Sequence, residues 1–210
     1  MTKKIVLATG NAGKLAELQA LLSPIEISVV PQTDFEIGEA VEDGLTFVEN
    51  ALIKARYACQ HTGLPALADD SGLEVTALNG TPGIYSSRYA AMNNKGQGDA
   101  ANNALLLKTL ENETNRAASF HCTLVFMRHE ADPTPLICSA SWSGEIAHAA
   151  SGTTGFGYDP IFYVPEFGQT VAELGAEVKK QHSHRAKALQ KMISKLSTKP
   201  STNMNLQNGG

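Results

Sequence analysis

Two adjacent carboxylates follow a short apolar run in Leu-Ala-Asp-Asp-Ser-Gly, residues 67–72. Successive side chains of an extended strand point to opposite faces, so Asp69 and Asp70 are not expected to share a proton as an acidic dyad. One can face a cleft and hold a metal ion or a water molecule, while the other ties down loop amides. Carboxylates that end an apolar run are costly to place unless they are hydrogen-bonded or bind a cation. The alternative interpretation is an Asx turn that closes a strand.

A glycine-containing turn, Ala-Thr-Gly-Asn-Ala-Gly-Lys at residues 8–14, follows the apolar run Ile-Val-Leu. It is not a Walker A loop, because only two residues separate Gly10 from Gly13-Lys14 and Leu15 stands where the hydroxyl should be. Backbone N–H groups at the start of a helix nevertheless form an anion site, and Lys14 would add a full charge. The residues fit a phosphate-binding turn as well as an ordinary strand-to-helix turn with a solvated lysine.

An acidic loop at residues 36–44 supplies further oxygen ligands, namely Glu36, Glu39, Glu42 and Asp43. Hard carboxylates without a cluster of His and Cys residues favour Mg²⁺ over zinc. The alternative is a solvated acidic face, which is expected for most of these charges.

Two further stretches could complete a nucleotide site. Asn50 and Lys54 are four residues apart and share one side of a predicted helix, although a surface lysine is the simpler interpretation of Lys54 alone. In Gly-Phe-Gly-Tyr-Asp-Pro, Phe156 and Tyr158 stand between and beside glycines, where an exposed ring could stack on a base. A hairpin loop with core aromatics explains the same residues.

Near the C-terminus, Ser183 can cap a last helix, which leaves His184 and Arg185 in its first turn. Cations there oppose the helix dipole, but for these residues alone an exposed basic helix start is the simpler interpretation. Together, the stretches supply amides and cations for a polyphosphate, carboxylates for a metal ion and an aromatic platform for a base.

The elements that must position these residues can be read from the hydrophobic pattern. Residues 4–8, 26–30, 73–78, 119–128 and 136–146 read as strands, and helices are expected at about 15–22, from 46, at 99–112 and at 183–196. Alternating strands and helices, with two long antiparallel strands inserted, predict an α/β domain with a mixed sheet flanked by helices. Residues 197–210 lack apolar side chains to bury and are expected to be a disordered tail.

Length and composition limit the class of protein. A chain of 210 residues fits one domain, and its net charge of −4 argues against a general nucleic-acid binder. Cys59, Cys122 and Cys138 are odd in number and form no CxxC pair, which favours buried thiols in a reducing compartment. No apolar run approaches membrane-spanning length, so the sequence predicts a cytoplasmic protein without membrane partners.

Six motifs, in order from about residue 4 to residue 196, resemble the inosine/xanthosine triphosphate pyrophosphatases that cleanse the nucleotide pool. They are TGNAGK, GLTFVENALIKA, ADDSGL, PGIYSSRYA, TTGFGYDPIF and SHRAKAL. The resemblance implies a single two-lobed α/β domain over residues 1–196 with the active cleft between its lobes, and a homodimer. It also implies Mg²⁺-dependent hydrolysis of dITP, ITP and XTP to the monophosphate and pyrophosphate.

By position, the resemblance also implies the roles of individual residues. Asp70 matches the general base and, with Glu42, a metal ligand, while Glu39 stays possible as a ligand. Substrate-binding positions are Thr9, Gly10, Asn11, Ala12, Gly13, Lys14, Ser71, Phe156, Gly157, Tyr158, Asp159, Lys179, His184 and Arg185. Lys54 is expected to join Lys14 in neutralising the triphosphate. Selectivity is expected from donors on His184 or Arg185 that face the 6-keto oxygen of the purine.

Two stretches depart from the family's pattern. TTGFGYD replaces the more usual Thr-Gly-Gly, and MNNKGQGDAANN, residues 92–103, is an unusual version of a variable loop. The second departure could alter a surface or a dimer contact and places no catalytic residue in doubt.

Three other functions are compatible with parts of the sequence. A Maf-type pyrophosphatase is similar in fold but is disfavoured by the GFGYDP and SHR stretches. A nucleotide sensor without catalysis is disfavoured by the intact ADDSG stretch, and a phosphotransfer enzyme by the lack of a second-substrate motif.

Overall fold

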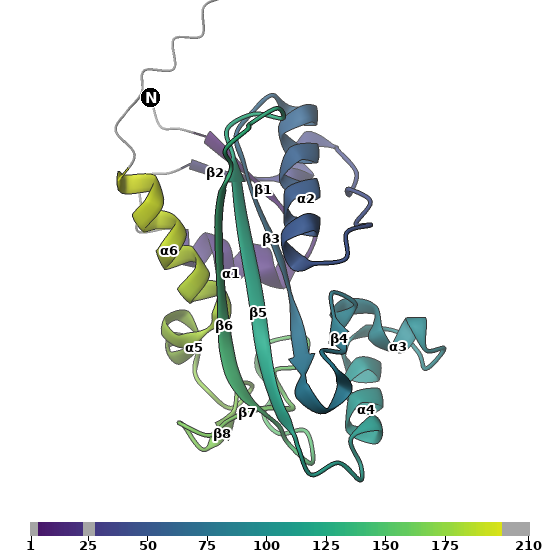
Figure 1. Cartoon of the computed structure of the whole chain (residues 1–210). Coiled ribbons are helices and arrows are strands. Elements are labelled where there is room, and N and C mark those ends of the chain that lie inside the picture. Colours follow the sequence, from purple (N-terminus) through teal and green to yellow (C-terminus); the bar gives the residue numbers. More distant parts are fainter. Residues whose placement is uncertain (1–3, 23–27, 199–210) are drawn as a thin grey trace, which may run out of the picture.

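The computed structural model describes residues 4–22 and 28–198, and its strands form one mixed sheet (Figure 1). The strands are β1 (Lys4–Ala8), β2 (Ser28–Pro31), β3 (Ala66–Val75), β4 (Pro82–Gly83), β5 (Ala117–Met127), β6 (Leu136–Ile146), β7 (Phe162–Val164) and β8 (Gln169–Thr170). Their order is β2-β1-β3-β5-β6-β7-β8, and β4 pairs with β3 beside this path. β1 is parallel to β2 and β3, whereas β3, β5, β6, β7 and β8 pair antiparallel. The predicted α/β fold with a mixed sheet is confirmed.

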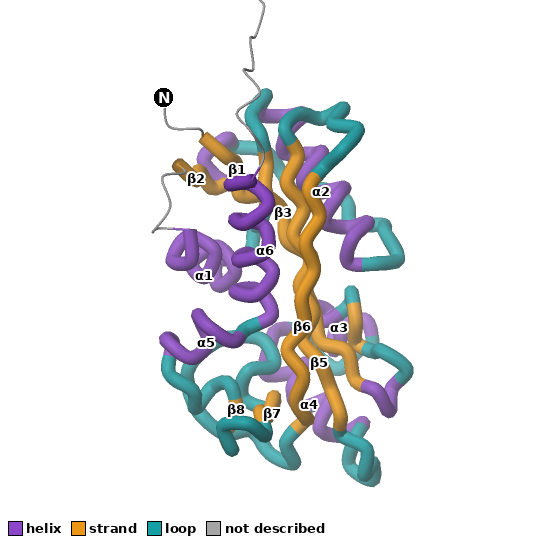
Figure 2. The backbone as a smooth tube through the Cα atoms, turned by 60° about the vertical axis from the view of Figure 1, so that its left-hand side comes forward, coloured by secondary structure: helices purple, strands orange, loops and turns teal. Residues whose placement is uncertain are grey.

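Helices cover both faces of this sheet. They are α1 (Ala12–Leu22), α2 (Phe47–Thr62), α3 (Tyr89–Met92), α4 (Gly98–Thr109), α5 (Ala176–His182) and α6 (His184–Thr198), with short 3-10 turns η1 (Gln32–Phe35), η2 (Thr76–Leu78) and η3 (Ser86–Arg88). α2 lies on one face, and α1 and α6 lie on the other, as Figures 1 and 2 show from two sides.

Strand alternation decides which helix each side chain meets. In β1, Ile5 and Leu7 join the cluster around α1 and α6, whereas Val6 and Ala8 join the cluster around α2. In β3, Leu67 belongs to the first cluster and Ala66 and Ala68 to the second. Because the alternation continues along the strand, Asp69 is directed to the α1 and α6 side and Asp70 to the α2 side.

A third apolar cluster occupies the other end of β5 and β6. Phe120 and Trp142 from these two strands pack there with Phe162 of β7 and Leu106 of α4. Asp69 and Asp70 therefore lie along β3 between cores built at the two ends of the long hairpin.

β3 corrects one prediction. The sequence suggested an apolar run that ends at the aspartates and a second strand from Leu73, but Ala66–Val75 is one strand. Each of its residues pairs with β5, from Ala66 opposite Met127 to Val75 opposite Ala118. The Asx-turn interpretation of Asp69 and Asp70 is therefore wrong, because the long partner strand keeps the chain extended through both aspartates.

The predicted helix caps are confirmed. Glu49 N donates to Thr46 Oγ1 at 3.3 Å, and Thr46 Oγ1 donates to Glu49 Oε2 at 2.8 Å, which is a capping box at the start of α2. At α6, Ala186 N donates to Ser183 Oγ at 3.1 Å. α6 continues to Thr198, two residues past its predicted end, and so enters the predicted tail.

Some expectations lie outside the described residues. They are the state of residues 199–210 and the first two residues of the predicted 26–30 strand, of which β2 begins at Ser28. The sequence reading missed α3, α5, β4, β7 and β8, which have two to seven residues and are too short for a clear hydrophobic period.

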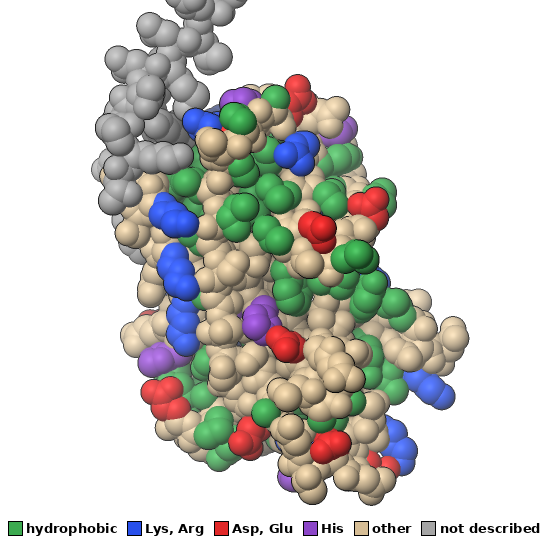
Figure 3. Space-filling view, viewed as in Figure 1, with side chains coloured by type: hydrophobic (Ala, Val, Ile, Leu, Met, Phe, Trp, Pro, Cys, Tyr) green, Lys and Arg blue, Asp and Glu red, His purple; other side chains and the backbone are tan. Residues whose placement is uncertain are grey.

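A row of basic side chains along the α6 side is visible in Figure 3. In that helix, Lys191 donates to Ser139 O at 2.8 Å and Lys195 donates to Ile137 O at 2.9 Å. These bonds occupy carbonyls of β6 where β7 does not pair with it, since β7 pairs along the described part of β6 only with Glu145 and Ile146. Lysines on an open strand edge also discourage pairing with another chain. Within residues 4–22 and 28–198, no helix is long and apolar enough to cross a membrane.

Candidate active site

Asp70, Lys54 and Glu42 form a charged group on the α2 side of the sheet. Lys54 Nζ lies 2.8 Å from Asp70 Oδ1 and 3.3 Å from Glu42 Oε1. Lys54 projects from the middle of α2, and its side chain is only 12% exposed, so it is not a surface lysine. Asp70 Oδ2 is buried without a hydrogen-bond partner among the described residues. One carboxylate oxygen therefore remains available to a ligand.

The start of α2 positions Glu42. Asn50 is fully buried and its Oδ1 accepts a hydrogen bond from Gly44 N at 2.9 Å. Glu49 Oε2 accepts another from Leu45 N at 2.9 Å. These two bonds fix the end of the acidic loop against the helix, which brings Glu42 to Lys54.

Burial and charge act together on this group. Burial raises the pKa of the Asp70 carboxyl above its usual value, and the Lys54 ammonium opposes part of that rise. Burial alone would lower the pKa of Lys54, but the carboxylates of Asp69, Asp70 and Glu42 outweigh it and raise the pKa. Lys54 is therefore a permanent cation beside a carboxylate of increased basicity.

Asp69 faces the opposite side of the sheet and is held by cations. Its Oδ2 lies 3.2 Å from Lys14 Nζ and 3.6 Å from Arg185 Nε, and it accepts a hydrogen bond from Ser71 Oγ at 3.0 Å. Burial would raise the pKa of Asp69, but the nearby cations, Lys14 first, lower it well below its usual range. The expectation that this aspartate ties down loop amides is wrong: the contacts found for it in the described chain are cations and a hydroxyl. Its separation from Asp70 onto the other face confirms that the pair is no acidic dyad.

The residue 9–14 turn is packed between the acidic loop and the aromatic loop. Asn11 Oδ1 accepts from Lys14 N at 3.0 Å and Thr9 Oγ1 accepts from Asn11 N at 3.3 Å, which shapes the start of α1. A β-carbon on Gly10 would collide with the Glu39 carboxylate, and one on Gly13 would lie 2.8 Å from Phe156. Glu39 is exposed and flexible enough to move aside, whereas the Phe156 ring requires glycine at position 13 for its close approach. Lys14 is only 16% exposed, which excludes a solvated lysine.

The aromatic loop forms the other side of the site. Lys179 Nζ lies 4.6 Å from the centre of the Phe156 ring and 2.7 Å from Asp159 Oδ2. Asp159 Oδ2 also accepts from Phe156 N at 2.9 Å, so a single carboxylate orients both the ring and the cation. Tyr158 is buried and donates to Ser86 O at 2.8 Å. Of the two aromatics, Phe156 lines the cavity with Lys179 over its ring, and Tyr158 belongs to the core.

His184 and Arg185 are both buried, which contradicts an exposed basic helix start. The His184 ring stacks on Phe120 with centroids 4.8 Å apart, and Arg185 Nη2 donates to Ser71 Oγ at 3.0 Å. Burial, and then the positive charge of Arg185, lowers the pKa of His184 well below its usual value. His184 is therefore a neutral ring, and its Nδ1 has no hydrogen-bond partner among the described residues.

Two adjoining cavities contain almost all of the predicted site. One, of about 200 Å³, lies beside Glu42, Lys54 and Asp70; the other, of about 90 Å³, lies beside Phe156 and Arg185. Asn11, Lys14, Ser71 and Ser87 line both. Predicted residues that line one or both are Thr9, Gly10, Asn11, Lys14, Glu42, Lys54, Asp70, Ser71, Phe156, Gly157, Tyr158, Asp159, Lys179, His184 and Arg185. The exceptions are Ala12 and Gly13, which line neither.

Sequence reasoning missed Glu17, Ser87 and Asp99. Glu17 forms ion pairs with Lys179, at 2.6 Å, and with Arg185, and so ties α1 to both cations of the aromatic cavity. Its position three residues after Lys14 on a predicted helix was the available signal. Ser87 lies in the PGIYSSRYA motif and Asp99 in the unusual stretch 92–103, but nothing in either stretch singled these residues out as site residues.

The carboxylates of Glu42 and Asp70 supply part of a binding site for the predicted Mg²⁺. Within the described chain, no three His, Cys, Asp or Glu side chains form a metal-binding cluster. Mg²⁺ is usually held by one or two carboxylates together with substrate phosphates and water, so a complete protein cage is not required. Glu42 and Asp70 already share one cation, Lys54 Nζ, and Asp70 Oδ2 is unpartnered. This pair fits a metal that binds with its substrate.

An α/β fold whose cleft joins carboxylates and cations to an aromatic platform has the layout of a nucleotide-binding enzyme. The chain belongs to the Ham1 family, whose model matches residues 5–195. It is 56% identical over 191 residues to a dITP/XTP pyrophosphatase of Vibrio cholerae, covering 91% of this chain and 95% of the relative. It is 53% identical over 194 residues to one of Pectobacterium atrosepticum, covering 92% and 98%.

A solved structure shares the fold. A HAM1 protein from Coxiella burnetii matches with a TM-score of 0.86 and 51% sequence identity, covering 93% of this chain and 99% of that protein. The family assignment confirms the resemblance read from the six motifs and removes the Maf-type alternative.

Proposed function

We propose that this chain hydrolyses dITP, ITP and XTP to the nucleoside monophosphate and pyrophosphate, and so keeps deaminated purines out of DNA and RNA. The observation that carries the proposal is the pair of joined cavities, with a cation and carboxylate group in one and an aromatic platform in the other. The names of the relatives, at more than half identity, support the same reaction.

The phosphate end is assigned to Lys14, Lys54 and the turn before α1. The first amides of an α-helix have no carbonyl partner within the helix, and the helix dipole favours an anion there. Lys14 borders both cavities, so its ammonium group can contact a triphosphate that extends from one cavity into the other, including the part that leaves as pyrophosphate. As the anhydride bond between the α- and β-phosphates breaks, the two lysines stabilise the developing charge on pyrophosphate.

Asp70 is assigned as the general base. Its free Oδ2 can accept a proton from a water molecule, whose oxygen attacks the α-phosphorus while the bond to the bridging oxygen breaks. Glu42 and Asp70 would hold Mg²⁺, which supplies positive charge to the phosphate oxygens when it is bound. Burial raises the basicity of Asp70, which suits this role.

The base end is assigned to Phe156, His184 and Arg185. A purine can stack on Phe156, and Arg185 and His184 supply donors for an acceptor oxygen at purine position 6. Asp159 and Lys179 orient the ring, as their contacts with Phe156 suggest. Ser71 lies between the two ends, because it lines both cavities.

The proposal extends to the setting of the enzyme. We infer a homodimer in the cytoplasm, with residues 1–196 as one two-lobed domain; the family resemblance and three free, buried cysteines support this. Val41 and Leu45, each 80% exposed, supply apolar surface for a second copy. A nucleic-acid partner is not expected, because Lys191 and Lys195 are engaged with β6 carbonyls and the net charge is −4.

The deciding experiment measures pyrophosphate release from ITP, dITP, XTP, GTP and ATP, with and without Mg²⁺. We expect ITP, dITP and XTP to be cleaved rapidly, and only with the metal. Binding without any pyrophosphate release would instead favour a nucleotide sensor, and transfer of phosphate to another acceptor would favour a phosphotransfer enzyme.

A further inference from the structure

The unusual stretch 92–103 contributes the start of α4, which contacts the aromatic loop directly. Asp99 Oδ2 accepts a hydrogen bond from Gly157 N at 2.6 Å, and Asn103 Nδ2 donates to Gly157 O at 3.0 Å. Residues four apart on a helix share a face, so one face of α4 holds both the N–H and the C=O of a single residue. Gly157 directly follows Phe156.

The backbone of this loop is unusual enough to need such support. Gly155 and Gly157 have positive φ angles of 83° and 63°, which glycine adopts freely. Glycine also gives the loop many alternative conformations when it is not restrained. On the other side of Phe156, the Asp159 carboxylate accepts from Phe156 N. The ring is thus fixed by Asp159 from within the loop and by α4 from outside it.

α4 also holds the second loop that borders the aromatic cavity. Asn102 Oδ1 accepts from Ala90 N at 2.8 Å, and Asn102 Nδ2 donates to Ser87 O at 3.2 Å. Ser87 lines both cavities. The polar face of α4 therefore connects the two loops that lie around the proposed base site.

We propose that Asp99 and Asn103 are positioning residues that fix the Gly157 peptide groups and thereby hold Phe156 ready to stack on the purine. This inference rests on the proposed function and extends it to a segment with no assigned role. Neither residue takes part in the chemistry, so their loss affects binding of the base and leaves the phosphate end intact. Gln97 makes no side-chain cap hydrogen bond at the start of α4, and Asp99 is exposed. The Asp99 carboxylate is therefore directed to the neighbouring loop, where it accepts from Gly157 N.

The test uses the full chain with Asp70→Asn, so that ligands bind without turnover, and measures affinity by calorimetry. The probes are ITP, which has a base, and inorganic tripolyphosphate, which has none. We expect Asp99→Ala and Asn103→Ala each to weaken ITP binding roughly fivefold, the effect of one modest hydrogen bond. Tripolyphosphate affinity should stay unchanged. In the active enzyme, the same variants should raise KM for ITP more than they lower kcat.

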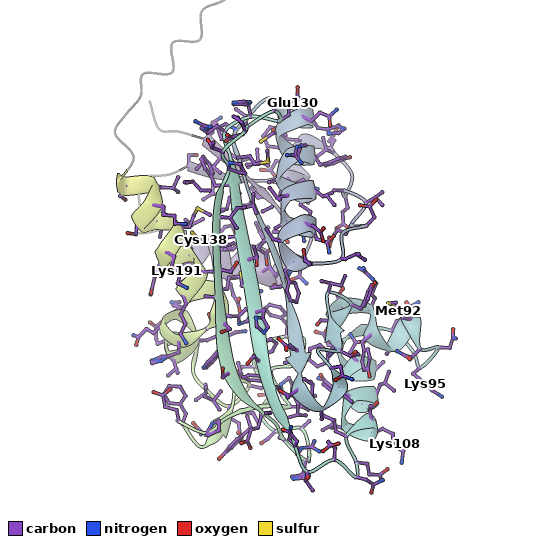
Figure 4. The ribbon with its side chains drawn as sticks, in the orientation of Figure 1. Met92, Lys95, Lys108, Glu130, Cys138 and Lys191 are labelled. Atoms are coloured by element: carbon purple, nitrogen blue, oxygen red, sulfur yellow. The ribbon has the colours of Figure 1, made fainter. Side chains whose placement is uncertain are left out.

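Three controls make the result specific. Asp99→Asn keeps an acceptor oxygen and should bind ITP nearly as the parent does. Lys108→Ala changes an exposed residue at the far end of α4 that points away from the sheet (Figure 4) and lines neither cavity, so it should have no effect. Hydrogen exchange at the Gly157 amide should accelerate in Asp99→Ala and not in Lys108→Ala.

Unchanged ITP affinity in folded Asp99→Ala and Asn103→Ala proteins would overturn the positioning role. An equal loss of tripolyphosphate affinity would also overturn it, because the effect would then not be confined to the base. A parent chain that binds no nucleoside triphosphate would overturn the proposed function itself, and that result is distinct from the other two.

Discussion

Lys54 Nζ lies 2.8 Å from Asp70 Oδ1, across the boundary between α2 and β3. The ion pair brings a cation from the middle of α2 to a buried carboxylate, while the second oxygen of that carboxylate has no partner among the described residues. A carboxylate that is half paired and half free can be held in place and still accept a proton. Asp70 and Lys54 therefore form the central pair of the proposed catalytic site.

Asp70→Asn is expected to abolish hydrolysis while the protein still folds. The amide is almost the same size but lacks the charge needed by water and metal, and loss of a positioned base costs roughly 10²–10⁴-fold in rate. Pyrophosphate release from ITP, together with a thermal unfolding curve, measures both effects. Near-normal turnover in the variant would remove Asp70 from the role of base.

Lys14→Ala should raise KM, lower kcat and also reduce stability. The loss of stability is expected because Lys14 is paired with Asp69, whose side chain is fully buried. Leaving a buried carboxylate with fewer partners costs about 1–3 kcal/mol. Lys180→Ala is the matched control, since Lys180 is exposed and pairs with exposed Glu177. Kinetics identical to those of the parent would show that Lys14 does not bind substrate and that the residue 9–14 turn has a purely structural role.

Removal of divalent metal with a chelator should stop pyrophosphate release, and added Mg²⁺ should restore it. If Glu42 shares the metal with Asp70, Glu42→Gln should need a higher Mg²⁺ concentration for half-maximal rate. Glu36→Gln, in the same acidic stretch but outside both cavities, serves as the control. A metal-independent rate would contradict the assignment of these carboxylates.

ITP and XTP should be cleaved far better than ATP. Arg185→Ala should reduce the ratio of kcat/KM for ITP to kcat/KM for ATP, because it lowers ITP cleavage. Adenine presents a donor at position 6, so a donor on the protein would lose its partner, which costs about 1–3 kcal/mol for each unsatisfied group. The measurement is kcat/KM for ITP, XTP, GTP and ATP in both proteins. Equal values for ATP and ITP in the parent would indicate a general triphosphate pyrophosphatase.

His184 should make folding sensitive to mild acid. Its pKa is lowered in the folded chain, so the unfolded chain binds the proton more tightly and stability is lost as pH falls below the unfolded value of about 6.5. The slope is at most about 1.4 kcal/mol per pH unit for one proton. Urea unfolding between pH 7 and about 5 should show a smaller loss in His184→Gln. Equal slopes in parent and variant would contradict a buried neutral ring.

The sequence alone determined those helix starts and strands that depend on residues close together in the chain. The capping box at Thr46 and Glu49, the cap at Ser183 and the hairpin of β5 and β6 each depend on residues close together in the chain, and the structure confirms them. The six motifs predicted the family, and nearly all of the predicted site residues line the two cavities. Opposite directions for Asp69 and Asp70 also followed from strand alternation alone.

Tertiary structure decided the partners of those residues. Whether Lys14 and Arg185 are solvated or buried depends on Asp69, which lies 55 residues from Lys14 and 116 residues from Arg185 in the sequence. The continuity of β3 through the aspartates depends on its pairing with β5. The hydrogen bonds of Asn103 and Asp99 with Gly157 join residues that are 54 and 58 positions apart. Such contacts leave no local pattern, because burial and charge pairing are set by which distant segments the fold brings together.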